Sequence, residues 1–166
     1  QQICASLSQL SSYLDWKVID QVIQLIHDSD NVAFFGTQFS HSVALHFQTD
    51  LLMLEKFTMA YMEQTNQLQC AKELDENSVA IILTVSGHIF NGNQKMISYI
   101  KKSNAKVVII TNDQDFDFGF EPDYVIGIGD PKYKRTGKHN LLTTMELMAL
   151  RYYSIYYPDV KDNIIE

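Results

Sequence analysis

The sequence predicts an α/β fold, a doubly wound three-layer αβα sandwich around a five-stranded parallel sheet in the flavodoxin-like order 2-1-3-4-5. Runs at 32–35, 79–83 and 106–111 are almost wholly apolar, which indicates strands that are covered on both faces. Segments with helical periodicity separate these runs. Strands that alternate with helices favour parallel strands joined by right-handed crossovers.

Two helices are expected before the first strand. Residues 1–14 carry one apolar seam with 4-3-4 spacing, formed by Ile3, Leu7, Leu10 and Leu14. Two heptads are too few for a coiled coil, so the seam predicts a linker helix that packs on another element. A second helix starts at Asp15 with a new apolar face, and the polar run 28–31 ends it.

The middle of the chain continues the alternation. We expect strand one at 32–35, a helix at 40–56 and a second strand near 57–62. A short helix around 66–74 then precedes strand three at 79–83.

The remaining elements follow the same order. A helix is expected from about 91 to 103, followed by strand four at 106–111. A loop rich in Asp and Phe spans 113–122. The predicted fifth strand covers 124–128 and is followed by a turn-rich segment, and a last helix runs over 139–157.

The last helix is apolar on more than one face, and such a helix must be buried on most sides. We therefore expect one face to pack on the sheet and the other to meet a partner subunit in a homodimer, with tyrosines at the interface. Its apolar residues are Leu141, Leu142, Met145, Leu147, Met148, Leu150, Tyr152, Tyr153, Ile155, Tyr156 and Tyr157.

Composition narrows the function. The chain has 166 residues, 46% of them hydrophobic and 20% charged, which fits one globular domain over 15–166. A net charge of −7 disfavours a nucleic-acid surface on this segment. Cys4 and Cys70 form no metal-ligand pattern, so reduced thiols, no metal and no cofactor are expected. With no membrane-spanning stretch or signal peptide, we expect a cytoplasmic protein without a membrane partner.

Two strand-to-helix loops point to an anionic ligand. The first strand ends in Gly36 and leads to Ser40, and the third ends in Thr84, followed by Ser86 and Gly87. Helix N-termini leave N–H groups unpaired, and in an open parallel sheet ligands collect where the strand order reverses. Hydroxyls without a P-loop lysine suit a small phosphorylated ligand better than ATP. Capping alone is the simpler alternative for Thr84 and Ser86.

These loops resemble those of a sugar isomerase (SIS) domain, and the pattern is most similar to the effector half of RpiR-type bacterial transcriptional regulators. In that family the third-strand loop reads S-x-S-G-x-T and the first reads G-x-G-x-S. Thr84, Ser86 and Gly87 match the former, and Gly36 and Ser40 match the ends of the latter. The resemblance covers about 15–157.

The resemblance implies a sugar phosphate ligand and a set of binding residues. That set is Gly36, Thr37, Gln38, Ser40, Thr84, Val85, Ser86, Gly87, His88, Ile89 and Arg135, the last from Arg135-Thr136-Gly137, which looks like the family's R-x-G. The chain departs from the pattern at Ile89, in place of a phosphate-binding threonine, at Gln38, in place of glycine, and at His88, in place of a frequent glutamate. We expect weak affinity because Ile89 cannot donate a hydrogen bond.

Further residues near these loops are secondary candidates. His41 is a possible ligand contact, and a basic cluster at 132–138, formed by Lys132, Lys134, Arg135 and Lys138, could attract an anion.

The resemblance leaves three functions open. The first is a non-catalytic effector domain, with DNA contacted only through a missing N-terminal domain, since the chain begins Gln1-Gln2 without methionine. The second is an aldose–ketose phosphosugar isomerase, which needs a base near the sugar carbons. The candidates Glu55, Glu63, His88 and His139 form no recognisable catalytic pattern. The third is a domain with a decayed site that serves dimerisation alone.

Overall fold

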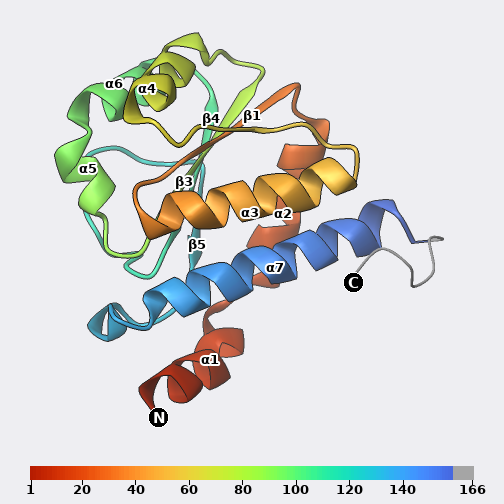
Figure 1. Ribbon diagram of the computed structural model, residues 1–166, viewed down its shortest axis with the longest axis vertical. Helices are drawn as coiled ribbons and strands as arrows, with labels where there is room; N and C mark the ends of the chain where they lie inside the picture. Colours follow the sequence, from red (N-terminus) through yellow and green to blue (C-terminus); the bar gives the residue numbers. More distant parts are fainter. Residues whose placement is uncertain (159–166) are drawn as a thin grey trace.

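The computed structural model describes residues 1–158 and confirms the predicted sheet. Its five strands lie in the order β2-β1-β3-β4-β5, and each neighbouring pair is parallel. The strands are β1 (Asn31–Phe35), β2 (Met59–Ala60), β3 (Ser78–Thr84), β4 (Lys106–Thr111) and β5 (Tyr124–Gly127). Helices cover both faces of this sheet, which gives three layers (Figure 1).

Side chains alternate between the two faces because successive residues of a strand point in opposite directions. In β3, Ile81 and Leu83 join one core cluster, and Ala80 and Ile82 join the other. The helices α2 (Trp16–Asp28), α3 (Phe39–Met53) and α7 (Gly137–Tyr156) cover the first face, and α4 (Gln64–Glu73), α5 (His88–Gly92) and α6 (Gln94–Lys102) cover the second. All seven residues of β3 are buried, as its apolar composition predicts.

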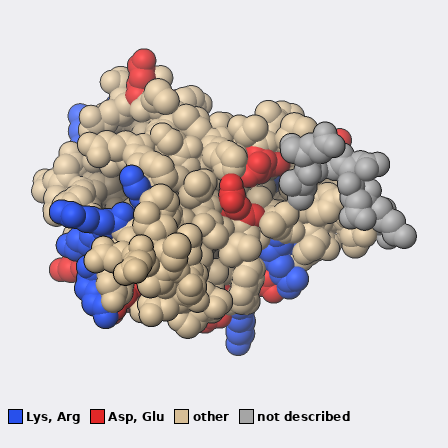
Figure 2. All heavy atoms as spheres, turned by 60° about the horizontal axis from the view of Figure 1, so that its bottom comes forward, with Lys and Arg blue, Asp and Glu red and all other residues tan. Residues whose placement is uncertain are grey.

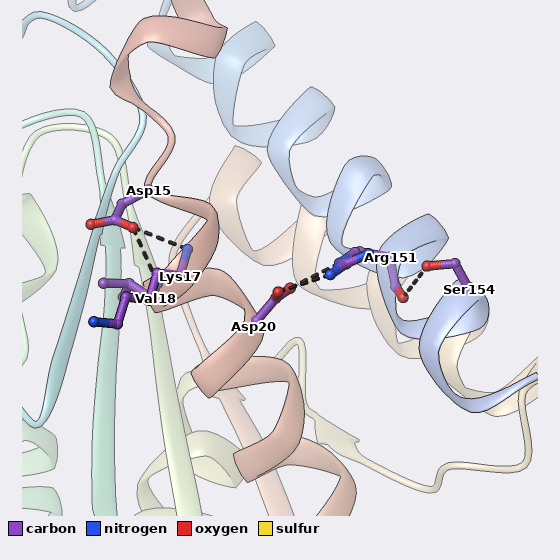
Figure 3. A network of polar contacts seen from close by, with 6 residues as sticks. All are labelled: Asp15, Lys17, Val18, Asp20, Arg151 and Ser154. Carbon is purple, nitrogen blue, oxygen red and sulfur yellow. Dashed lines mark hydrogen bonds and ion pairs between the residues drawn. The ribbon is translucent and has the colours of Figure 1, made fainter.

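Helix α2 is fixed at its start and on its flank (Figure 3). The Asp15 carboxylate accepts hydrogen bonds from the backbone N–H groups of Lys17 and Val18, at 3.0 and 3.3 Å, and so acts as the N-cap. Asp20 accepts two hydrogen bonds of 2.9 Å from the guanidinium of Arg151 on α7. This bidentate contact lowers the pKa of Asp20 and joins the two helices.

The structure corrects several predicted boundaries. The second strand is two residues long instead of six, and α4 begins at Gln64 instead of 66. The helix predicted over 91–103 is two helices, α5 and α6, and it begins at His88. Asn93 breaks it with φ −130° and ψ 41°, and its side-chain amide donates to the Ile89 carbonyl. Asparagine favours such breaks because its side chain competes with the helical backbone bonds.

The N-terminal helix α1 (Gln2–Tyr13) forms as predicted and packs on α7 (Figure 1). Its seam is discontinuous, since Leu10 and Leu14 are buried whereas Ile3 is 44% exposed. Ser6 is also buried, and its hydroxyl donates to the side-chain Oδ1 of Asn140 at 3.2 Å. The helix is therefore docked on the domain rather than extended from it.

Part of the apolar surface of α7 packs within its own chain, and its outward face is exposed or half-buried. Tyr152 is buried and its hydroxyl is hydrogen-bonded to His27 Nδ1 at 2.7 Å. Tyr156 stacks on the same imidazole, with ring centroids 3.6 Å apart. Helices α1, α2 and α3 all pack on α7, which leaves Leu150 and Ile155 as its exposed large apolar side chains. The tyrosines Tyr152 and Tyr156 are thus intramolecular contacts, and dimerisation stays a prediction.

Candidate functional site

The first loop (residues 36–40) joins β1 to α3 and is held by a side chain from α4. Gln67, 4% exposed, accepts from the Gly36 N–H at 3.2 Å and donates to the Gly36 carbonyl at 2.9 Å. A Cβ at Gly36 would lie 3.1 Å from the backbone nitrogen of His41, so glycine allows β1 to end against the start of α3. Thr37 and Gln38 are exposed beyond this clamp, and Ser40 is buried.

Gln38 has an unusual backbone. Its φ of 51° and ψ of −123° lie in a region that L-residues rarely adopt. This is the position where the SIS pattern has glycine. The loop therefore keeps the glycine-type conformation although the side chain is glutamine.

The second loop (residues 84–89) is anchored to the core at both ends. Thr84 is buried and its Oγ1 accepts from the Gly87 N–H at 2.9 Å, which closes the turn before α5. Gly87 has φ 77°, and a Cβ there would lie 2.7 Å from the Phe116 ring. Ile89 is 1% exposed within the core cluster on the α4–α6 face. Its side chain thus belongs to the core, and the expectation that Ile89 stands as a non-donating ligand contact is corrected.

Ser86 is the second-loop hydroxyl that stays available for a ligand. It is half-buried, and its hydroxyl makes no hydrogen bond to any of residues 1–158. Val85 is also half-buried, and His88 is exposed. A Cβ at Gly137 would lie 2.6 Å from Val85, so the N-terminus of α7 closely approaches this loop. A 20-residue helix that begins here contributes positive potential at the same edge of the sheet.

The basic cluster at 132–138 is partly neutralised. Lys132 forms an ion pair of 2.7 Å with Asp130, and this contact lowers the pKa of the Asp130 carboxyl. Lys138 lies over the Phe39 ring at 5.7 Å, which brings the starts of α3 and α7 together. Arg135 is exposed and has no ion pair with the described residues. Several Lys and Arg side chains gather at the end of the molecule where α7 begins. Most of the remaining surface in this view has neither basic nor acidic side chains (Figure 2).

A pocket of about 560 Å³ opens beside the first loop at the carboxyl edge of the sheet. Ser40, the second loop and Arg135 are not part of its lining. The lining residues are Gly36, Thr37, Gln38, His41, Ser42, Met62, Gln64, Gln67, Gly92 and Asn93. Of the sequence candidates, the pocket therefore unites Gly36, Thr37, Gln38 and His41.

Sequence reasoning missed the α4 side of this pocket. Gln64 and Gln67 are ordinary polar residues in a helical segment, and nothing in their spacing marks a site. The useful signal would have been that α4 follows β2, so that its first turn must lie at the carboxyl edge. Asn93 was missed because the break between α5 and α6 was not predicted.

His41 is the buried imidazole of the pocket lining. It is 5% exposed, and burial lowers the pKa of its imidazole, which favours the neutral ring. Nε2 contacts the Tyr61 carbonyl, which can only accept, so the proton of the neutral ring is on Nε2. Nδ1 is then an acceptor, and it has no hydrogen-bond partner among the described residues.

The part of the chain that the structure describes was searched for metal sites, reactive thiols, catalytic bases and membrane-spanning helices. No group of three or more His, Cys, Asp or Glu side chains could hold a metal ion there. Cys70 is buried, and burial raises the pKa of its thiol to about 11, which disfavours the reactive thiolate. None of Glu55, Glu63, His88 and His139 lines the pocket. No helix of residues 1–158 has the length and hydropathy needed to cross a membrane.

Comparison with known proteins identifies the fold. No protein-family model and no curated protein matches the sequence. The structure is similar to the Vibrio vulnificus NanR protein complexed with ManNAc-6P, with a TM-score of 0.80 and 14% identity over 94% of this chain and 61% of that one. This chain thus spans less than two thirds of the NanR chain.

Two further structures match along most of both chains. The sugar isomerase domain of an RpiR transcription factor from Sphaerobacter thermophilus has a TM-score of 0.65 and 15% identity, with 92% of each chain covered. A phosphoheptose isomerase from Francisella tularensis has a TM-score of 0.74 and 14% identity, with 90% of this chain and 91% of that one covered. The chain therefore has the α/β fold of SIS domains, like that of RpiR-type regulators, and this fold is shared by regulators and isomerases.

Proposed function

We propose that this chain is the effector-binding and dimerisation domain of a cytoplasmic, bacterial RpiR-type transcriptional regulator. It binds a phosphorylated sugar or a related carbohydrate derivative without catalysis. DNA is contacted through a domain outside this sequence. The observation that carries the proposal is the polar pocket beside the first loop, in a fold shared with NanR and an RpiR factor.

The proposed ligand lies across the carboxyl edge of the sheet. Strands β1 and β3 are neighbours, so the first and second loops leave the sheet side by side. The phosphate is held by the Ser40 and Ser86 hydroxyls and by backbone N–H groups of the second loop, near the starts of α3 and α7. The sugar extends into the pocket.

The absence of catalysis is proposed from the chemistry of the pocket. Isomerisation of an aldose to a ketose requires a base that removes a proton from carbon. The pocket lining contains no carboxylate from the described residues, and the basic Nδ1 of its imidazole is buried with almost no accessible surface. The net charge of −7 supports the assignment of DNA binding to another domain.

A thermal-shift titration with sugar phosphates tests the proposal, because a ligand that binds the native state raises the melting temperature. We expect at least one sugar phosphate to stabilise the chain, and Ser86→Ala to abolish the shift while leaving the melting temperature without ligand unchanged. Ser98→Ala, a serine of α6 outside the proposed ligand site, is the matched control. Tight binding that survives Ser86→Ala would contradict the assigned phosphate position.

A phosphosugar isomerase is the second candidate, favoured by the similarity to the phosphoheptose isomerase fold. A coupled assay with aldose and ketose phosphates distinguishes an isomerase from a non-catalytic effector domain. Turnover that persists through rigorous purification would contradict the non-catalytic proposal and support the isomerase.

The proposed homodimer is tested by sedimentation. Because Leu150 and Ile155 are the exposed large apolar residues of α7, Leu150→Arg should shift the population towards monomer. A 19.1 kDa monomer for the unmodified chain at micromolar concentration would contradict dimerisation.

A further inference from the structure

The pocket beside the first loop is lined by uncharged groups. Among the described residues its polar lining consists of the amides Gln38, Gln64, Gln67 and Asn93, the hydroxyls Thr37 and Ser42, and the imidazole of His41. No Asp, Glu, Lys or Arg of residues 1–158 belongs to the lining. The volume of about 560 Å³ is in the range of small-molecule sites.

The amide side chains differ in how much of their hydrogen-bonding capacity is already taken up by other residues of the protein. Both ends of the Gln67 amide are bonded to Gly36, so this side chain is structural. Gln64 Nε2 donates to the side-chain Oδ1 of Asn93 at 2.6 Å, and this contact joins the start of α4 to the junction of α5 and α6. Gln64 is exposed and its amide oxygen remains an acceptor. Thr37 and Ser42 hydroxyls can donate or accept.

The imidazole of His41 is uncharged as well. Its ring is buried at 5% exposure, its Nε2 is engaged by the Tyr61 carbonyl, and its Nδ1 has no hydrogen-bond partner among the described residues. Protonation would place a donor and a positive charge in a buried position. Because Nδ1 has almost no accessible surface, the ring offers the pocket no charge that could balance an ammonium or a carboxylate of a ligand.

We propose that this pocket selects the uncharged part of the ligand, so that the chain binds sugar phosphates whose remaining groups are hydroxyls or N-acyl groups and rejects those that carry an ammonium or a carboxylate. This inference rests on the proposed function, and it concerns which sugar phosphates are bound. A charged group transferred from water into the pocket would find no counter-ion, whereas hydroxyl and amide groups would find donors and acceptors. Glu63 and Lys138, charged residues near in sequence or space, are not part of the lining.

Calorimetric titration of this chain with four probes tests the inference. Glucose 6-phosphate and N-acetylglucosamine 6-phosphate carry no further charge, glucosamine 6-phosphate adds an ammonium, and 6-phosphogluconate adds a carboxylate. We expect at least one uncharged probe to bind about tenfold or more tightly than both charged ones. If a charged probe binds as tightly as the uncharged ones, the inference fails and the proposed function stands. If none of the four binds, both fail.

A charge substitution sharpens the same test. Gln64→Glu should shift the preference by about tenfold towards glucosamine 6-phosphate relative to N-acetylglucosamine 6-phosphate, since the carboxylate supplies the missing counter-ion. Gln21→Glu, an exposed glutamine of α2 outside the lining, makes the same change in net charge and should leave the ratio unchanged. Equal ratios in all three proteins would overturn the inference, and melting curves show whether each variant is folded.

Discussion

The two loops at the carboxyl edge of the sheet begin on neighbouring strands, yet they are built in different ways. The first loop is held from outside the strand by the Gln67 amide and leaves its next two residues exposed beside a pocket. The second loop is held by its own Thr84 hydroxyl and by Ile89, which is buried in the core. A sequence motif in each loop therefore corresponds to an open surface in one case and to a largely closed turn in the other.

This difference changes how the departures from the SIS pattern are interpreted. Ile89 replaces a threonine by an apolar side chain that packs into the core, so the substitution affects folding first. Gln38 replaces a glycine by an exposed side chain at the pocket, so the substitution changes the pocket lining rather than the core. Burial, which the sequence does not state, separates these two effects.

The largest effect is expected at the clamp of the first loop. Gln67→Ala leaves the N–H and the carbonyl of Gly36 without a protein partner and should lower the free energy of unfolding by about 2–4 kcal/mol. Urea denaturation with an unchanged m-value measures it. Gln64→Ala, one turn earlier and exposed, is the control, with a change below about 0.5 kcal/mol. Equal effects for the two glutamines would show that the clamp does not hold the loop.

A smaller loss is expected when the family's threonine is restored in the second loop. Ile89→Thr removes buried apolar surface and buries a hydroxyl, so it should destabilise the chain by about 2 kcal/mol. The sequence analysis instead treated Ile89 as a missing hydrogen-bond donor to the ligand. Ile89→Val, which keeps the site apolar, should cost about 1 kcal/mol. An Ile89→Thr variant that is as stable as the parent and binds phosphate more tightly would restore the earlier interpretation.

The turn of the second loop should contribute less than either buried contact. Thr84→Val keeps the shape of the side chain but removes the acceptor of the Gly87 N–H, at a cost of about 1 kcal/mol. Thr84→Ser retains the hydroxyl and should restore most of this hydrogen bond. Thermal melts of the three proteins compare them. If valine and serine behave alike, the hydroxyl does not stabilise the turn.

The smallest expected effect is a dependence of the free energy of unfolding on pH, through His41 beside the first loop. Burial lowers the pKa of His41 below its ordinary value of 6.5, so the unfolded chain binds a proton there at a pH where the folded chain does not. The stability contributed by neutral His41 is thus present above about pH 6.5 and is lost as the pH falls towards the depressed pKa. His41→Gln should flatten this part of the stability profile, which urea denaturation at a series of pH values measures.

Much of the fold could be predicted from the sequence because the signals are local. The buried runs of β3 and β4 and the amphipathic face of α2 are visible without tertiary information, and the strand order is confirmed. The break at Asn93 was missed although Asn91-Gly92-Asn93 contains residues that favour turns, because the apolar residues on either side of it keep a helical spacing. The short β2 pairs with the sheet through only two residues, so its length depends on contacts that the sequence does not encode locally.

The candidate site was predicted only on its strand side. Glycine and hydroxyl residues after β1 and β3 mark the loops, because strand ends and helix starts have characteristic residues. The pairing of Gln67 with Gly36 spans 31 positions and becomes visible only in three dimensions. For the same reason the burial of Ile89 and the unpaired Nδ1 of His41 could not be inferred from residue type.

The backbone conformation of Gln38 sets the stability of the domain against the composition of its pocket. A residue with a Cβ at φ 51° carries a conformational penalty of roughly 1–2 kcal/mol that glycine avoids. Stability alone therefore favours glycine here, while the pocket retains a glutamine amide. Position 38 is thus a point of trade-off, where the domain is less stable than its fold permits and its ligand surface is richer in hydrogen-bonding groups.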